Sequence, residues 1–226
     1  MALSTCPNIA LTIVKWPVAL AALALLPGTC IALAGLASQV ISDPVPIAWF
    51  AAGFFAYVAL WGIAFKRRFM GSFFSTFEHE LTHSLFAWLT FHRVVGLKAT
   101  WDSGGEMTYE GRGNWLISIA PYWFPTLCVP FMIMSTLGQF AGQTWVAVGL
   151  GATFAYHLLS THLETHSQQT DLIETTKTFA WLFLPTANLV AAGYVIAFAL
   201  GGLKPANHFL ITIWQQTRPL LVYALE

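Results

Sequence analysis

Charged residues are scarce in this sequence. Only 9% of the 226 residues are Asp, Glu, Lys or Arg, whereas about 25% is typical of a soluble domain, and 57% are hydrophobic. This composition excludes an ordinary soluble domain and predicts an integral membrane protein. The formal net charge is zero, so charge gives no reason to expect a nucleic-acid partner.

Cysteine is also rare. Cys6, Cys30 and Cys128 are widely separated, and the last two lie in apolar runs. An odd number of cysteines at such spacing fits neither a disulfide framework nor a thiolate zinc site. We therefore interpret Cys30 and Cys128 as small buried hydrophobic residues. Any metal would have to be bound by His and carboxylate side chains.

Long stretches without charge predict about six transmembrane helices in a single polytopic domain, 1–226. Each stretch approaches or exceeds the roughly 20 apolar residues that cross a bilayer. Lys15 before the first stretch also fits a signal peptide, but the length of the run favours a retained helix. The predicted spans are 16–42, 47–65, 72–91, 115–137, 145–160 and 179–200.

Two further features modify this arrangement of spans. Pro121, Pro125 and Pro130 lie inside the fourth span and predict kinks or local unwinding, which membranes tolerate where protein satisfies the backbone. The tail 207–226 is apolar but interrupted by polar residues. It is expected either at the membrane interface or docked on the helix bundle.

The most informative stretch is His79-Glu80-Leu81-Thr82-His83, which matches the pattern HExxH. On a helix, residues four apart lie on one face, so both histidines can reach one metal ion. Glu80 flanks that face and can act as a base without being a ligand. No Lys or Arg occurs between Arg68 and Arg93, so the motif is expected inside a membrane helix, where ionisable groups are costly and usually functional.

The stretch 93–114 is polar, unlike its surroundings. Two short β-prone runs, 98–101 and 106–109, flank Asp102-Ser103-Gly104-Gly105. Such runs around a Gly-rich turn predict a hairpin. The expected fold is therefore an all-α integral membrane protein with a short β-hairpin after the HExxH helix.

A catalytic zinc usually takes three protein ligands and a water, so a third ligand is needed beside the two motif histidines. Candidates gather at the end of the fifth span and between it and the sixth. Asp171 precedes the sixth span, and His162 and His166 are four residues apart. The polar residues of this second cluster are His157, His162, Glu164, His166, Gln168, Gln169, Asp171 and Glu174.

Together these features resemble the site-2-protease family of intramembrane zinc metallopeptidases. The HExxH motif in an apolar helix, the hairpin with Gly104 and Gly105, further apolar helices, and Asp171 beside a later span follow the order of that family. The resemblance covers roughly 72–200, which would be the catalytic core. It implies that the hairpin presents the substrate as an extended strand.

The resemblance also implies the activity and the site. It implies Zn²⁺ held by His79, His83 and Asp171, with Glu80 as general base towards a zinc-activated water. The substrate would be a membrane protein or peptide, cleaved in or near the lipid bilayer.

The third ligand stays open. The family's aspartate is usually followed by glycine, whereas Leu172 follows Asp171 here. His157, His162 and His166 are therefore retained as alternative ligands, as ligands of a second metal, as partners that orient a ligand, or as ordinary polar residues at a helix end.

Two other functions fit parts of the pattern. A membrane di-iron oxygenase would use the two HxxxH pairs, His79/His83 and His162/His166, and would contain iron and depend on oxygen. A non-catalytic zinc-binding chaperone or assembly factor would keep its function after the substitution Glu80→Gln. Facing histidines could also ligate a haem, which a Soret band would reveal.

The orientation in the membrane is also open. Six spans would place six of the ten basic residues on one side, which favours that side as cytosolic. The family resemblance favours the other side, which carries the hairpin.

Overall fold

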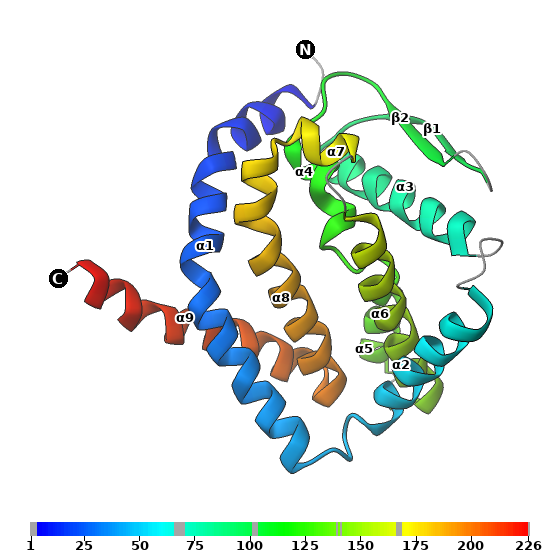
Figure 1. The fold of residues 1–226 in the computed structure, drawn as a ribbon, viewed down its shortest axis with the longest axis vertical. Helices are drawn as coiled ribbons and strands as arrows, with labels where there is room; N and C mark the ends of the chain where they lie inside the picture. Colours follow the sequence, from blue (N-terminus) through cyan, green and yellow to red (C-terminus); the bar gives the residue numbers. More distant parts are fainter. Residues whose placement is uncertain are drawn as a thin grey trace.

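The computed structural model describes residues 4–65, 71–100, 104–138, 140, 142–165 and 169–225. The described chain is mostly helical, with a two-stranded sheet of β1 (Val94–Ala99) and β2 (Gly105–Tyr109) (Figure 1). The helices are α1 (Thr5–Ser42), α2 (Ala48–Leu60), α3 (Gly71–Leu89), α4 (Trp115–Ile119), α5 (Cys128–Thr136), α6 (Thr144–Glu164), α7 (Thr170–Glu174), α8 (Lys177–Gly201) and α9 (Leu203–Leu225). A π-helical turn, Trp61–Phe65, continues α2, and a 3-10 turn, Ala120–Tyr122, follows α4.

Two helices of the described chain, α1 and α8, are long and apolar enough to cross a membrane, and 48–63 forms a shorter apolar helix. With 38 residues, α1 is about 57 Å long, almost twice the roughly 30 Å of a bilayer's hydrocarbon core. It begins at Thr5, well before the predicted span, and packs against α8 and α9. The full set of six spans stays a prediction.

Helices α2 and α6 pack closely through glycine. A Cβ atom added at Gly53 would overlap the carbonyl oxygen of Val148, and one added at Gly151 would overlap that of Phe50. Small residues that let helix backbones approach are typical of membrane proteins. Phe50 and Phe154 fill the core beside this contact.

The fourth predicted span is not one helix. It is divided into α4, the 3-10 turn that contains Pro121, and α5. Asn188 of α8 donates hydrogen bonds to the carbonyl oxygens of Tyr122 (3.0 Å) and Leu184 (3.0 Å). The interruption expected from the prolines is thus present, and a side chain from a neighbouring helix satisfies one of the freed carbonyls.

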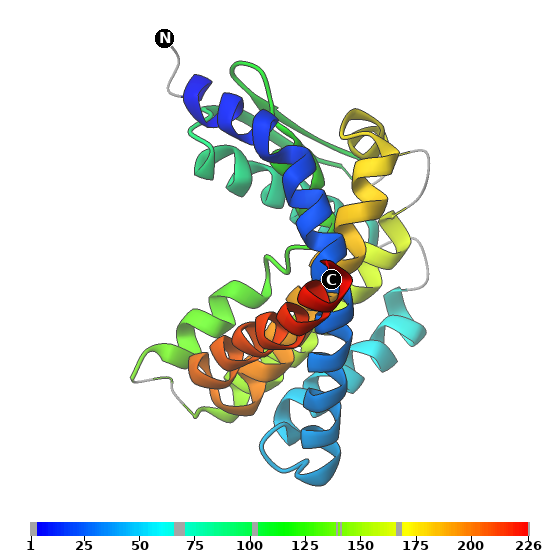
Figure 2. The same cartoon turned by 90° about the vertical axis from the view of Figure 1, so that its left-hand side faces the viewer.

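The predicted hairpin is also present, with antiparallel register Lys98↔Glu106 and Ala99↔Gly105. Both strands contact α3. The hairpin, α3, α4 and α7 gather at the end of the molecule where α1 begins (Figures 1 and 2). Residues 101–103 of the predicted turn lie outside the described part.

One sequence-based expectation about burial is wrong. Cys128 is buried as expected, but Cys30 is exposed. Cys30 lies on α1, and in a membrane bundle an apolar residue on an outer helix can face lipid, so an apolar neighbourhood does not imply burial inside the protein.

The C-terminal tail forms α9, which packs on α1 and α8. Phe209 and Ile213 are buried there, and Thr217 lies directly against Gly28 of α1. Beyond this point the helix is exposed, and Tyr223 has 83% of its surface accessible. Docking on the bundle therefore describes the first part of the tail.

Candidate metal centre

Helix α3 carries the HExxH motif and places both histidines on one face. His79 and His83 are buried, with their ring centroids 4.7 Å apart. The spacing of four residues on a helix accounts for this proximity. Thr82, between them in sequence, is buried, and its hydroxyl donates to the carbonyl oxygen of Glu78 (2.9 Å).

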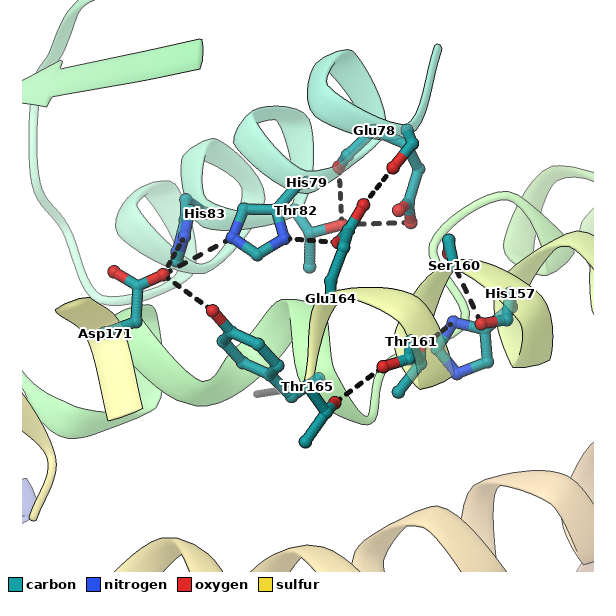
Figure 3. Close-up of polar contacts among 12 residues, drawn as sticks. Glu78, His79, Thr82, His83, His157, Ser160, Thr161, Glu164, Thr165 and Asp171 are labelled. Carbon is teal, nitrogen blue, oxygen red and sulfur yellow. Dashed lines mark hydrogen bonds and ion pairs between the residues drawn. The ribbon is translucent and has the colours of Figure 1, made fainter. Parts of the chain in front are cut away.

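The short helix α7 brings Asp171 to these histidines. Its Oδ2 atom lies 3.4 Å from Nε2 of His79 and 3.5 Å from Nε2 of His83 (Figure 3). Burial alone would raise the pKa of the Asp171 carboxyl, but in the metal-free site the two facing imidazoles, protonated at Nε2, outweigh burial and keep the pKa below its usual value. Asp171 therefore offers an ionised oxygen to the same point in space as both imidazoles.

The three side chains fit a zinc ion. One ligand atom from each of His79, His83 and Asp171 lies within 4.8 Å of the others. Two ligand atoms at about 2.1 Å from a common ion, in tetrahedral geometry, lie about 3.4 Å apart. The observed separations of 3.4 and 3.5 Å match that value. Two imidazoles and a carboxylate, with room for a further ligand, are also a typical donor set of catalytic zinc.

Hydrogen bonds from the opposite edges of the two imidazole rings orient them. Nδ1 of His79 donates to Oε2 of Glu164 (2.9 Å), and Nδ1 of His83 donates to the carbonyl oxygen of Ile117 (2.8 Å). With the proton on Nδ1, each Nε2 keeps a lone pair for a metal. Outer partners of this kind set the tautomer and orientation of metal-binding histidines.

The broken fourth segment explains why the Ile117 carbonyl is accessible. Asn114 caps α4 by accepting hydrogen bonds from the backbone N–H groups of Leu116 and Ile117. In a continuing helix, the Ile117 carbonyl would accept from the residue four positions later. That residue is Pro121, which has no N–H. His83 supplies a hydrogen bond to this carbonyl instead.

Tyr122 fixes the third candidate ligand. Its hydroxyl donates to Oδ2 of Asp171 (3.0 Å), and its ring packs edge-on against His79 at 5.3 Å between centroids. Tyr122 is almost fully buried. The buried Tyr122 ring thus holds the Asp171 carboxylate from one side, and Asp171 also lines the cavity.

Glu80 lies in the cavity beside this cluster. Its residue surface is 9% exposed, and no hydrogen-bond partner for its carboxylate is found among the described residues. A Cβ atom added at Gly105 of β2 would lie 2.6 Å from Cγ and 2.9 Å from Oε1 of Glu80. The hairpin therefore passes directly over the candidate base, and a side chain at Gly105 would displace it.

The cavity has a volume of about 640 Å³ and is strongly acidic. Of the described residues that line it, none is Lys or Arg, and Gly104 and Gly105 form part of its rim on the hairpin. Gly104 has φ +79°, a conformation that favours glycine. The carboxylates of the lining are Glu80, Glu106, Glu164, Asp171 and Glu174.

The other candidate histidines do not join this group. His157 is buried in α6, with Nδ1 3.5 Å from the hydroxyl of Thr161, away from Asp171 (Figure 3). His162 is exposed in the last turn of α6. His166 lies outside the described residues. In the part of the chain that is described, His79, His83 and Asp171 form the one group of this kind.

Sequence reasoning assigned no role to Glu164, Tyr122 or the Ile117 carbonyl. Glu164 belonged to the second polar cluster, but no regular spacing links it to His79, 85 residues away. Pro121 was the available signal for the Ile117 carbonyl, because a proline leaves the carbonyl four residues earlier without its helical donor.

Comparison with known proteins agrees with this geometry. A family model described as Peptidase M50B-like matches residues 50–196, more than half of the chain. The chain belongs to this family. The site-2-protease resemblance is thereby confirmed, and the M50B-like match indicates a membrane metallopeptidase. The two apolar helices α1 and α8 agree with a membrane protein. No curated protein and no solved structure matches the chain.

Proposed function

We propose that this M50B-like protein is a multi-pass, membrane-embedded zinc metalloprotease that hydrolyses a peptide bond in or near the bilayer. His79, His83 and Asp171 would hold Zn²⁺, and Glu80 would be the general base. The proposed substrate is a membrane protein or a peptide that enters the cavity from the membrane or its surface.

One observation carries the proposal. Nε2 of His79 and of His83 face the Oδ2 atom of Asp171 at 3.4 and 3.5 Å, while both Nδ1 atoms donate to other acceptors. Without a metal, a proton on an imidazole can bridge Nε2 and Oδ2. Once both Nε2 atoms are deprotonated, three lone pairs converge on one point and repel each other unless a cation lies between them. A divalent metal supplies that charge in the M50B-like context.

The residues of the chain divide the chemistry between them. Zinc, when bound at this site, would polarise the scissile carbonyl and lower the pKa of water from about 15.7 towards 7. The Glu80 carboxylate, which lies in the cavity, would accept the proton of the attacking water and later deliver it to the leaving amine. Tyr122 holds Asp171 in place throughout.

The hairpin supports an extended substrate. Strand β2 lines the cavity at Gly105, Glu106 and Met107, and a substrate strand could add to its edge by backbone hydrogen bonds. A transmembrane helix has to unwind before hydrolysis, because its carbonyls are engaged in helical hydrogen bonds. Strand addition would hold the unwound segment beside Glu80.

The first test combines metal content with proteolysis. Purified wild type, Glu80→Gln and Asp171→Ala are analysed by mass spectrometry for zinc and iron, and single-span membrane peptides in proteoliposomes serve as substrates. We expect about one zinc per chain in wild type and in Glu80→Gln, with loss of zinc in Asp171→Ala. Peptide cleavage should fall by about 10² to 10⁴-fold in Glu80→Gln, the usual range for loss of a general base.

Other results would contradict the proposal. Two irons per chain would favour the di-iron oxygenase. Cleavage that is unchanged in Glu80→Gln would exclude Glu80 as the base. Zinc retained in Asp171→Ala would remove Asp171 from the ligand set, and His162 and His166 would be substituted next.

A further inference from the structure

We propose that Glu164 positions His79 for metal binding, as the carboxylate of a carboxylate–histidine–metal arrangement. This inference rests on the proposed metal site of His79, His83 and Asp171. It assigns a role to the last residue of α6.

Both carboxylate oxygens of Glu164 are engaged by helix α3. Oε2 accepts from Nδ1 of His79 at 2.9 Å, and Oε1 accepts from the hydroxyl of Ser75. Ser75 and His79 are four residues apart and lie on the same face of α3. Glu164 therefore bridges one helical turn and fixes the rotation of the His79 ring as well as its tautomer (Figure 3).

The same geometry separates Glu164 from the ligands. Its oxygen contacts Nδ1, whereas Asp171 faces Nε2 on the opposite edge of the ring. An oxygen that accepts the Nδ1 proton lies on the far side of the imidazole from the metal position. Glu164 thus acts through His79, and its negative charge makes Nε2 a better electron-pair donor.

The position of Glu164 in the chain links the site to the helix bundle. Helix α6 ends at Glu164, and the next helix, α7, carries Asp171. The hydroxyl of Tyr156, also on α6, donates to the carbonyl oxygen of Phe74 on α3 at 3.1 Å. The end of α6 and the segment after it therefore supply both a ligand and the group that orients another ligand.

The test measures metal binding without any substrate. Apoprotein in detergent is titrated with Zn²⁺ in competition with a chromophoric chelator, and with Co²⁺ followed by visible absorption. The variants are Glu164→Gln, which keeps a hydrogen-bond acceptor but loses the charge, and Glu164→Ala, which loses both. The matched control is Glu174→Gln, which removes a carboxylate that lines the same cavity and accepts a hydrogen bond from Ser118.

We expect graded losses of zinc affinity. Glu164→Ala should bind Zn²⁺ about 100-fold more weakly and Glu164→Gln about 10-fold more weakly, the range seen when outer partners of metal ligands are removed. Glu174→Gln should stay close to wild type. The Co²⁺ absorption bands should change in Glu164→Ala, because the His79 ring is no longer held, while the apoprotein keeps its helical circular dichroism.

Each contrary result has a distinct meaning. Wild-type affinity and an unchanged Co²⁺ spectrum in both Glu164 variants would overturn the inference and leave the zinc site intact. Equal losses in Glu164→Gln and Glu174→Gln would show a general charge effect and would also overturn it. If wild type itself binds no metal, the proposed function fails first.

Discussion

The two ends of helix α6, meaning its N-terminal half around Gly151 and its last residue, Glu164, are held in different ways. Near Gly151 the helix meets α2 so closely that a single added carbon would overlap the carbonyl oxygen of Phe50. At Glu164 it meets α3 through hydrogen bonds to His79 and Ser75, beside a cavity of about 640 Å³. One end is joined by shape and the other by polar chemistry.

The difference suggests that one part of α6 contributes mainly to stability and the other mainly to function. Where lipid surrounds a bundle, helix association depends on close packing of small residues, because apolar burial gives little preference for protein over lipid. The glycine contact therefore sets where α6 lies, and its last residue can then orient His79. We expect volume changes to damage the first end, and changes in charge or hydrogen bonding to damage the second.

The largest effect is expected from breaking the packed end with Gly151→Val. The new side chain meets backbone atoms of α2, which cannot rotate away. We expect a loss of about 3 kcal/mol of stability, at the upper end of the range for overpacking, measured as a lower melting temperature in detergent.

The matched control for this change is Gly35→Val on α1, where an added Cβ meets nothing within 4 Å. It should melt within a few degrees of wild type. Equal destabilisation of the two variants would show that helix propensity, and not the contact with α2, causes the loss.

A smaller effect, confined to catalysis, is expected from Gly105→Ala at the polar end. The added methyl group would lie 2.5 Å from Cγ2 of Thr76 and 2.6 Å from Cγ of Glu80, so Glu80 has to move. Displacement of a reacting group by about 1 Å can cost about 100-fold in rate. We expect peptide cleavage to fall by about 10 to 100-fold, with zinc content and melting temperature unchanged.

Gly96→Ala, on the other strand of the hairpin, is the control for Gly105→Ala. Its Cβ atom would make ordinary contacts of 3.8 Å with Thr108. It should cleave peptides like wild type. Similar losses in both variants would attribute the effect to the hairpin as a whole and not to Glu80.

The smallest effect is expected from Pro121→Ala, which tests the hydrogen bond from His83 to the Ile117 carbonyl. Alanine restores an N–H that can compete with His83 for the Ile117 carbonyl. Zinc affinity should fall by roughly 10-fold or less, the lower end of the range for outer partners. Competition titration with a chelator measures it.

Pro130→Ala provides the comparison for that titration. Pro130 is in the first turn of α5, where backbone N–H groups lack helical partners in any case. The Pro130→Ala variant should bind zinc with the affinity of wild type. A Pro121→Ala variant with full affinity would show that His83 does not depend on the Ile117 carbonyl.

The three candidate ligands could be named from the sequence. Residues four apart on a helix share a face whatever surrounds them, so His79 and His83 could be paired from their spacing alone. Asp171 was suggested by the family resemblance, and the structure brings it within 3.5 Å of both imidazoles. That these three residues bind zinc remains a proposal.

Long-range contacts could not be derived from the spacing of residues, and Asp171 was named only because of its place in the polar cluster and the family resemblance. Asp171 and Glu164 reach His79 across 92 and 85 residues of sequence, and no periodicity encodes such distances. The Ile117 carbonyl is a backbone atom, which every residue has, so its own residue type gave no signal; the signal was Pro121, four residues later. Cys30 was misjudged for a related reason, since sequence does not distinguish a lipid-facing apolar position from a buried one.

The sequence by itself determined the local features of this protein. Its low charge required a membrane environment, its HExxH spacing placed two histidines on one helical face, and its prolines and glycines located the break after α4 and the hairpin. The tertiary structure alone decided which distant groups contact the two histidines. The last residue of α6, Glu164, meets Nδ1 of His79, and Asp171 of α7 meets Nε2, because such contacts depend on how distant helices pack.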